Sequence, residues 1–404
     1  MNKFFKKLAV VLSFVLVFAA MPMSVFAATT IGATSGNVTL TENVDLSSMH
    51  TFTGDTVLDL AGKTITAASG NAIQITNGTL TVKDSVGTGK IIAPNGQGIR
   101  VGENGDALKA GSLVLEGGTV EGTWGVTVWA GSSVTVNGGA INGSSMGISG
   151  NGNVGTNGNG GTTVIINNGT ISGITGIYHP QLGNITVNGG TITGSATGIE
   201  MRAGHLTVNA GTITGGNTYT VPASNGNGTT TSGVAVAVAP HTTNQAVSAT
   251  INGGTLTAAK SVAEVNPEGA TTTVVPTVSI SGGTHNGAVE TTQTSGIITG
   301  GTFTTAPSEN AVAPGYGSVS ENGAFVVRVP GEAEPAATGE HVWGYNPQYD
   351  AAAHWDYCHV CGAQNTPVAH SDANGDGVCD CGWVLANTPS RVNPNTGVTA
   401  DMLK

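Results

Sequence analysis

The triplet Gly-Gly-Thr, or a close variant, recurs through the middle of this 404-residue chain and constrains its fold more than any other feature. The copies have their second residue at positions 118, 139, 169, 190, 211, 254, 283 and 301, so the steps are 21, 30, 21, 21, 43, 29 and 18. A step of 43 is close to two periods, and the steps of 29 and 30 are one period with a loop added. A fixed period in this range is typical of proteins in which one structural unit stacks on copies of itself.

Each repeat contains three short segments of alternating aliphatic and small polar residues. The first precedes the glycine pair (112–115, 133–136, 184–187, 205–208, 278–280), the second follows it (119–121, 170–172, 191–193, 212–214), and the third begins with Gly and an aliphatic residue (98, 125, 147, 176, 198). Three strands in about 21 residues predict an all-β parallel β-helix with three strands per turn. The alternation points Leu113, Val134, Ile185 and Leu206 inward, each with the residue two positions later. Asparagines recur just before the corner, and we expect their amides to bond from turn to turn: Asn137, Asn167, Asn188, Asn209 and Asn252.

Composition narrows the class of protein. Charged residues make up 9% of the chain, against a usual share of about 25%. Acidic residues outnumber basic ones by 24 to 13, so nucleic-acid binding, which needs basic clusters, is not expected. Residues 1–27 resemble a secretory signal peptide, with lysines before an apolar run and small residues for cleavage. We therefore expect a secreted or cell-surface protein whose mature chain has no transmembrane segment.

Three N-terminal segments carry a family resemblance. They are Val38-Thr39-Leu40-Thr41-Glu42, the stretch 58–65 (LDLAGKTI) and the stretch 82–87 (VKDSVG). Together with the Gly-Gly-Thr-Ile units they resemble exported bacterial pectate-lyase-like right-handed parallel β-helix proteins, over roughly residues 30 to 305. That group includes polysaccharide lyases, glycosidases, carbohydrate binders and adhesins, so the resemblance implies a carbohydrate-related surface role in broad terms.

Carboxylates are scarce where an enzyme of this fold would need them. Such enzymes cluster carboxylates to hold calcium or to act as an acid–base pair on a glycosidic bond. This chain has no Asp between Asp106 and Asp350, and its glutamates there form no evident pair on one turn. The protein is therefore expected to be non-catalytic, with a lyase or hydrolase of atypical site, or a structural spacer or adhesin stalk, as the alternatives.

One outward strand face gathers distinctive side chains. In the third strand segment these are Arg100, Trp129, Tyr178, Glu200 and Arg202. Aromatic rings beside hydrogen-bonding groups suit a polysaccharide, because sugar faces stack on rings while hydroxyls need polar partners. We predict a binding strip here for polysaccharide or a matrix component. The alternative is a set of isolated surface substitutions. His179 and Met201 are expected to point inward as core residues.

The C-terminal segment contains a separate Cys/His module. It has two cysteine pairs, Cys358 with Cys361 and Cys379 with Cys381, and each pair is followed by Gly, as in zinc knuckles. The second pair has only one intervening residue, and exported cysteines also form disulfides, so zinc and disulfides both remain open. A calcium loop is also predicted, because the spacing of four residues is similar to that of dockerins and thrombospondin type 3 repeats: Asp372, Asn374, Asp376 and Asp380. The module also resembles small Cys/His modules on surface proteins of Gram-positive bacteria.

The expected organisation follows from these segments. It is a signal peptide at 1–27, a parallel β-helix at 28–329, a linker at 330–340, a metal- or disulfide-stapled module at 341–384 and a flexible tail at 385–404.

Overall fold

The structure is a computed structural model. It describes residues 30–152, 161–221, 231–265, 273–293, 296–329, 348–349, 353–355 and 366–371.

The predicted linker at 330–340 and the predicted flexible tail at 385–404 lie outside these residues, as do three further predictions. The first is the signal peptide. The second is the zinc or disulfide set, which consists of Cys358, Cys361, Cys379 and Cys381. The third is the calcium loop, which consists of Asp372, Asn374, Asp376 and Asp380.

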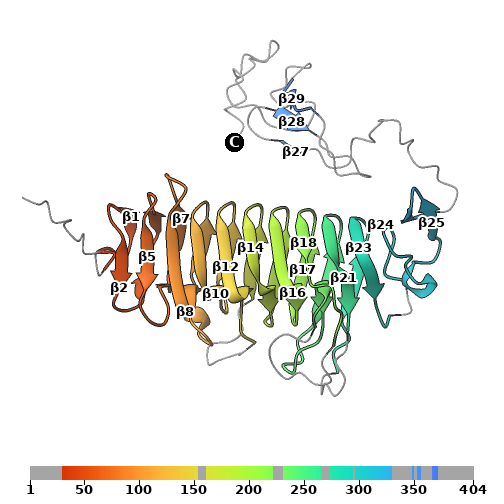
Figure 1. Cartoon of the computed structure of the whole chain (residues 1–404), viewed down its shortest axis with the longest axis horizontal. Coiled ribbons are helices and arrows are strands. Elements are labelled where there is room, and N and C mark those ends of the chain that lie inside the picture. The colour runs from red at the N-terminus through yellow and green to blue at the C-terminus, as the bar shows by residue number, and fades with distance from the viewer. Residues whose placement is uncertain are drawn as a thin grey trace, which may run out of the picture.

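The first of two large sheets is built entirely of parallel pairs (Figure 1). Its order is β1 (Gly36–Thr39), β4 (Thr56–Asp59), β7 (Thr79–Lys83), β9 (Ser112–Leu115), β11 (Ser133–Val136), β13 (Thr162–Ile166), β15 (Gly183–Val187), β17 (Gly204–Val208), β20 (Val247–Ile251) and β22 (Thr277–Ile280). Each strand pairs with the equivalent strand of the neighbouring repeats; Val134, for example, is in register with Leu113 and Val164. The repeat period is therefore the period of the sheet.

The second large sheet alternates with the first along the chain. Its main path is β2 (Val44–Leu46), β5 (Thr64–Ala67), β8 (Lys90–Val101), β10 (Thr119–Val128), β12 (Ala140–Ser149), β14 (Thr170–His179), β16 (Thr191–Met201), β18 (Thr212–Thr214), β21 (Thr255–Glu264), β23 (Thr284–Glu290), β24 (Thr302–Phe303), β26 (Ala324–Arg328) and β25 (Gly317–Glu321). Beside this path, β3 (His50–Phe52), β6 (Ile73–Ile75) and β19 (Val234–Val238) also pair in parallel. This all-β arrangement of parallel sheets is consistent with a parallel β-helix.

The long strands of the second sheet differ from the expected pattern. The sequence predicts two separate strands after the glycine pair, whereas β8, β10, β12, β14 and β16 each run through both segments. In β10 the register shifts between Gly122 and Trp124, which marks the bend between the segments. The backbone keeps its pairing on both sides of the bend, so the two segments form one strand.

Aliphatic residues of both sheets form one continuous core. The predicted inward residues Leu113, Val134, Ile185 and Leu206 are all buried in it, which confirms the period-2 prediction. The second residue of each glycine pair lies at the corner in the left-handed region, as at Gly139 (φ 74°) and Gly190 (φ 75°). A side chain at Gly190 would also come within 2.9 Å of the Gly169 carbonyl oxygen. Both the backbone angle and the stacking distance therefore require glycine.

The predicted asparagine ladder is present. The side-chain amide of each asparagine donates to the amide oxygen of the preceding one, at 2.9 Å from Asn167 to Asn137, 2.9 Å from Asn188 to Asn167, 2.9 Å from Asn209 to Asn188 and 3.0 Å from Asn252 to Asn209. Buried aliphatic columns thus stack beside an exposed polar column, and both connect neighbouring turns.

Asn188→Ala is expected to lower the free energy of unfolding by about 1 kcal/mol, because it removes two exposed ladder bonds, each of modest net value. Urea unfolding would measure the change. Asn217→Ala, at an exposed position outside the ladder, is the matched control and should leave the unfolding midpoint in place. Equal effects of the two substitutions would contradict a stabilising ladder.

The last strands of the second sheet change direction. β24 is parallel to β23 but antiparallel to β26, which pairs antiparallel with β25. Helix in the described ranges is confined to the single turns η1 (Ala107–Lys109) and η2 (Glu309–Ala311), so none there has membrane-spanning length. Near the C-terminus, β27 (Gln348–Tyr349), β28 (Ala353–Trp355) and β29 (Val368–Ala369) form a small antiparallel sheet.

Candidate ligand-binding groove

Two rows of side chains on the second segment of β8, β10 and β12 create the candidate site. In the first row, Trp124 is in register with Gln97 on one side and Met146 on the other. In the second row, Thr127 is in register with Arg100 and Ser149. Parallel pairing without offset therefore brings together residues that are more than 20 positions apart in the sequence.

The residues of these rows, except Arg100, border an open groove of about 330 Å³. Its lining residues are Gln97, Trp124, Thr127, Trp129, Met146, Ser149, Gly150, Asn151 and Tyr178. The groove therefore combines three aromatic rings with hydroxyl and amide groups.

The aromatic rings differ in exposure. Trp124 is 37% exposed, whereas Trp129 and Tyr178 are 7% and 4% exposed. The Arg100 guanidinium lies 4.5 Å from the centroid of the Trp129 ring, a distance typical of a cation–π contact. Burial lowers the pKa of Arg100 from its ordinary value, and the negative charge of Glu103 opposes that shift. Trp124 thus offers an accessible ring, while Trp129 is held in place by Arg100.

Polar groups of the groove are of two kinds. The hydroxyls of Thr127 and Ser149 lie 3.0 Å apart and bond to each other. Gln97 presents a side-chain oxygen that is buried and lacks a hydrogen-bond partner within the described part of the chain. A ligand with several hydroxyls could use both kinds of group.

The structure brings together only part of the predicted binding strip. Trp129 and Tyr178 line the groove, and Arg100 packs on Trp129. Glu200 and Arg202 are 0% exposed and do not line it, so the expectation that they lie exposed on this face is wrong. Their register is nevertheless that of the outward row, since Glu200 pairs with Tyr178.

Glu200 and Arg202 are buried because later segments cover this part of the sheet. Arg202 donates from Nε and Nη2 to the Pro240 carbonyl at 3.2 and 2.9 Å. The Thr231 hydroxyl donates to Glu200 Oε2 at 3.3 Å, and Glu200 Oε1 lies 3.7 Å from Arg202 Nη1. The ion pair is therefore enclosed between β16 and the chain around 231–240.

Small residues allow this cover to approach the sheet. Beyond Glu200 the outward row continues with Ala237 and Ala263, which belong to a second apolar cluster that Tyr219 packs against. Thr220 and Ser232 exchange backbone hydrogen bonds at 3.1 and 3.0 Å, which holds the two sides of the covering segment together. The outer face is thus open at the groove, covered at Glu200, Ala237 and Ala263, and accessible again at Glu290.

Trp124, Gln97 and Met146 line the groove but do not belong to the predicted strip. A usable signal was present, since each directly precedes the glycine of a Gly-aliphatic pair, at Gly98, Gly125 and Gly147. The bend at this glycine breaks the period-2 alternation. The residue directly before the glycine and the residue two positions after the glycine, such as Trp124 and Thr127, therefore both face outward. If the alternation is assumed to continue across the bend, the residues of this row are predicted to face inward.

His179 and His205 lie outside the groove lining and have hydrogen-bond partners elsewhere. His179 and Met201 are buried, as predicted. His205 Nδ1 lies 2.7 Å from the Ser248 hydroxyl, a contact that the sequence did not suggest. Because His205 and Ser248 are register partners on the first sheet, they lie outside the groove-lining set.

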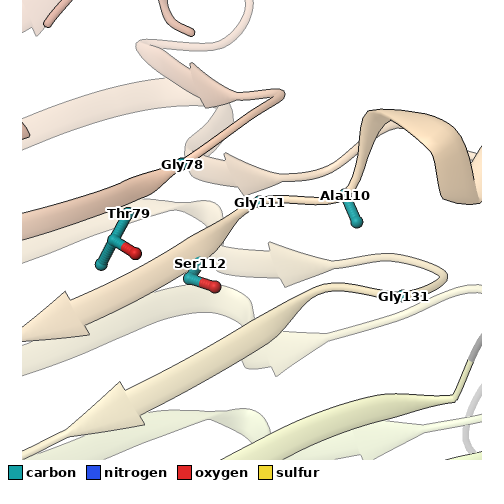
Figure 2. A pocket seen from close by; sticks show the side chains of 6 residues that line it. All are labelled: Gly78, Thr79, Ala110, Gly111, Ser112 and Gly131. Atoms are coloured by element: carbon teal, nitrogen blue, oxygen red, sulfur yellow. The ribbon is translucent and has the colours of Figure 1, made fainter. Parts of the chain in front are cut away.

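A second hollow, of about 200 Å³, lies at a corner between neighbouring turns (Figure 2). Its lining residues are Gly78, Thr79, Ala110, Gly111, Ser112 and Gly131. Only Thr79 and Ser112 contribute polar side chains, and they are register partners in β7 and β9. The hollow forms because glycine and alanine fill little space at the corner, and its two hydroxyl groups alone do not indicate a binding site.

No group of three or more potential metal ligands occurs within the residues that the structure covers. The predicted metal sites fall in the segments outside it, so neither is tested there and both stay predictions. These are the zinc or disulfide site of Cys358, Cys361, Cys379 and Cys381, and the calcium loop of Asp372, Asn374, Asp376 and Asp380.

Comparison with protein families, curated proteins and solved structures gives no match for this chain.

Proposed function

We propose that this chain is an exported, non-catalytic carbohydrate-binding protein of the cell surface or its surroundings. The single observation that supports this most is the groove in which Trp124, Trp129 and Tyr178 adjoin the Thr127–Ser149 hydroxyl pair. Aromatic faces pack against the apolar faces of sugar rings, and the hydroxyls exchange hydrogen bonds with sugar hydroxyls. In this proposal a right-handed parallel β-helix of the pectate-lyase-like type, with three strands per turn, presents the groove to solvent.

Binding without turnover fits the chemistry of the lining residues. Glycosidic cleavage by paired carboxylates needs two Asp or Glu side chains at the scissile bond. All nine residues that line the groove in the described structure carry uncharged side chains. The proposal therefore assigns the groove to retention of a polysaccharide, with the lyase or hydrolase and the passive stalk as alternatives.

A glycan array combined with assays for reducing and unsaturated ends tests the proposal. We expect retention of at least one polysaccharide without released product, and about tenfold weaker binding by Trp124→Ala, since exposed aromatic platforms dominate such contacts. Tyr316→Ala is the matched control, because Tyr316 is 36% exposed, close to the 37% of Trp124, and lies outside the groove. Product release would favour the enzyme, and absence of binding would favour the stalk.

The C-terminal module completes the proposal as a structural or adhesive unit. Cys358, Cys361, Cys379 and Cys381 would hold it through zinc or through disulfides, and Asp372–Asp380 would form a calcium loop. Metal analysis of the full chain, with thiol counting before and after reduction, separates zinc from disulfides. Bound zinc with four metal-protected thiols supports the zinc site, and the absence of free thiols without zinc supports disulfides.

A further inference from the structure

The proposed function leaves open which polysaccharides would bind. Resting on that function, we propose that the groove selects an uncharged polysaccharide and that Gln97 Oε1 accepts a hydrogen bond from one of its sugar hydroxyls.

The charges around the groove argue against an anionic ligand. All lining side chains are uncharged, so a uronate carboxylate would leave water without a paired cation. Arg100, the register partner of Thr127, is engaged with the Trp129 ring at 4.5 Å and lies under the electrostatic influence of Glu103. A neutral sugar loses far less hydration on entering such a site.

Gln97 supplies an acceptor on a backbone that is fixed by hydrogen bonds. Its backbone N–H donates to Asn71 Oδ1 at 2.9 Å, and its carbonyl accepts from Ala72 N–H at 3.1 Å, so the residue is held at both ends. Its side-chain oxygen is buried without a partner in the described chain, whereas the residue as a whole is half-buried and lines the groove, so a turn of the side-chain amide would present the oxygen to a ligand. A buried acceptor without a donor is unfavourable, and a hydroxyl of the ligand would satisfy it, whereas a carboxylate has no proton to give.

The neighbouring residues place a sugar within reach of that acceptor. Gln97 is the register partner of Trp124, the most exposed ring of the groove. A sugar stacked on Trp124 would have its equatorial hydroxyls directed sideways, toward the adjacent strands. The Thr127–Ser149 pair uses one of its two hydroxyl protons internally, which leaves the other and several lone pairs for the same ligand.

Titration calorimetry on the full chain tests the inference. The probes are three neutral hexasaccharides (of glucose, mannose and xylose) and one anionic hexasaccharide (of galacturonic acid). We expect a neutral probe to bind. Gln97→Leu should weaken it about tenfold, because the acceptor is lost. Gln97→Glu should keep its affinity within about threefold, because a carboxylate still accepts from a hydroxyl.

Gln293→Leu is the matched control, since Gln293 is half-buried and outside the groove, and it should bind like the unmodified chain. Thermal unfolding of each variant verifies that it is folded. Binding of the galacturonate probe alone, or unchanged neutral binding by Gln97→Leu, would overturn the inference and leave the proposed function intact. Absence of binding to every probe, with Trp124→Ala also without effect on the glycan array, would overturn both.

Discussion

Glu200→Ala is expected to lower the free energy of unfolding by about 3–5 kcal/mol, because it removes the carboxylate that faces the buried Arg202 guanidinium. Both side chains are fully enclosed, and the pair is separated by 3.7 Å. After the substitution, the Pro240 carbonyl would still accept from Arg202, but a dipole compensates a buried charge less than an anion does. Urea unfolding at neutral pH, followed by circular dichroism, measures the loss.

Two variants make this result specific. Glu121→Ala breaks the shorter Lys90–Glu121 pair, at 2.9 Å, but these side chains are 44% and 32% exposed, so the cost should stay below about 1 kcal/mol. The double substitution Glu200→Leu with Arg202→Leu removes both charges and should cost much less than Glu200→Ala alone. If Glu200→Ala and Glu121→Ala cost the same, burial of the Glu200–Arg202 pair is not energetically important.

Acidification from about pH 6.5 to pH 4 is expected to destabilise the fold by about 3 kcal/mol for each of three buried histidines of the described chain. Burial lowers the pKa of His179, His241 and His285 from 6.5 to about 4, and at His241 the positive charge of Arg202 adds to the effect of burial. Between these values the unfolded chain binds a proton at each site and the folded chain does not, so stability falls as the pH falls. Below about pH 4 the folded state is protonated too, and this contribution levels off.

The surroundings of His179 and His285 explain why the neutral form of each imidazole is favoured in the folded state. His179 contacts the Ala203 carbonyl at 3.1 Å, which can only accept, so Nδ1 carries the proton and Nε2 accepts from the Thr162 hydroxyl at 2.8 Å. His285 stacks on Phe303 with ring centroids 4.5 Å apart.

Unfolding free energies measured at intervals between pH 7 and pH 4.5 would give the slope, and His179→Gln should reduce it by about a third. Asp59 and Asp84 have pKa values lowered below 3.8 and therefore titrate below this window. A flat profile, or an unchanged slope in His179→Gln, would contradict the assignment.

The sequence predicts the stacked part of the fold well because that part is determined by local repetition. Alternation at Leu113 and Val134 and the spacing from Asn167 to Asn188 each follow from one period, and stacking brings them into register. The bend between the two segments of β10 was not predicted, since both flanking segments look like ordinary strands in isolation.

The candidate site was predictable only where it follows from the period. Trp129 and Tyr178 line the groove, because the register of the third segment is regular, but the sequence did not indicate that they are only 7% and 4% exposed. The burial of Glu200 depends on Thr231, which lies 31 positions later in an insertion that breaks the period. No local pattern around Glu200 records that contact, so the loss of exposure there could be found only in three dimensions.

The strands from β1 to β23 run across the long axis of the molecule, so the hydrogen bonds between them, the asparagine ladder included, point along that axis (Figure 1). Tension applied at the two ends would therefore load the turns in series, and the weakest junction would yield before its neighbours. Since each turn contacts only those beside it, the molecule would lengthen in steps of one turn and absorb mechanical work gradually instead of rupturing at once.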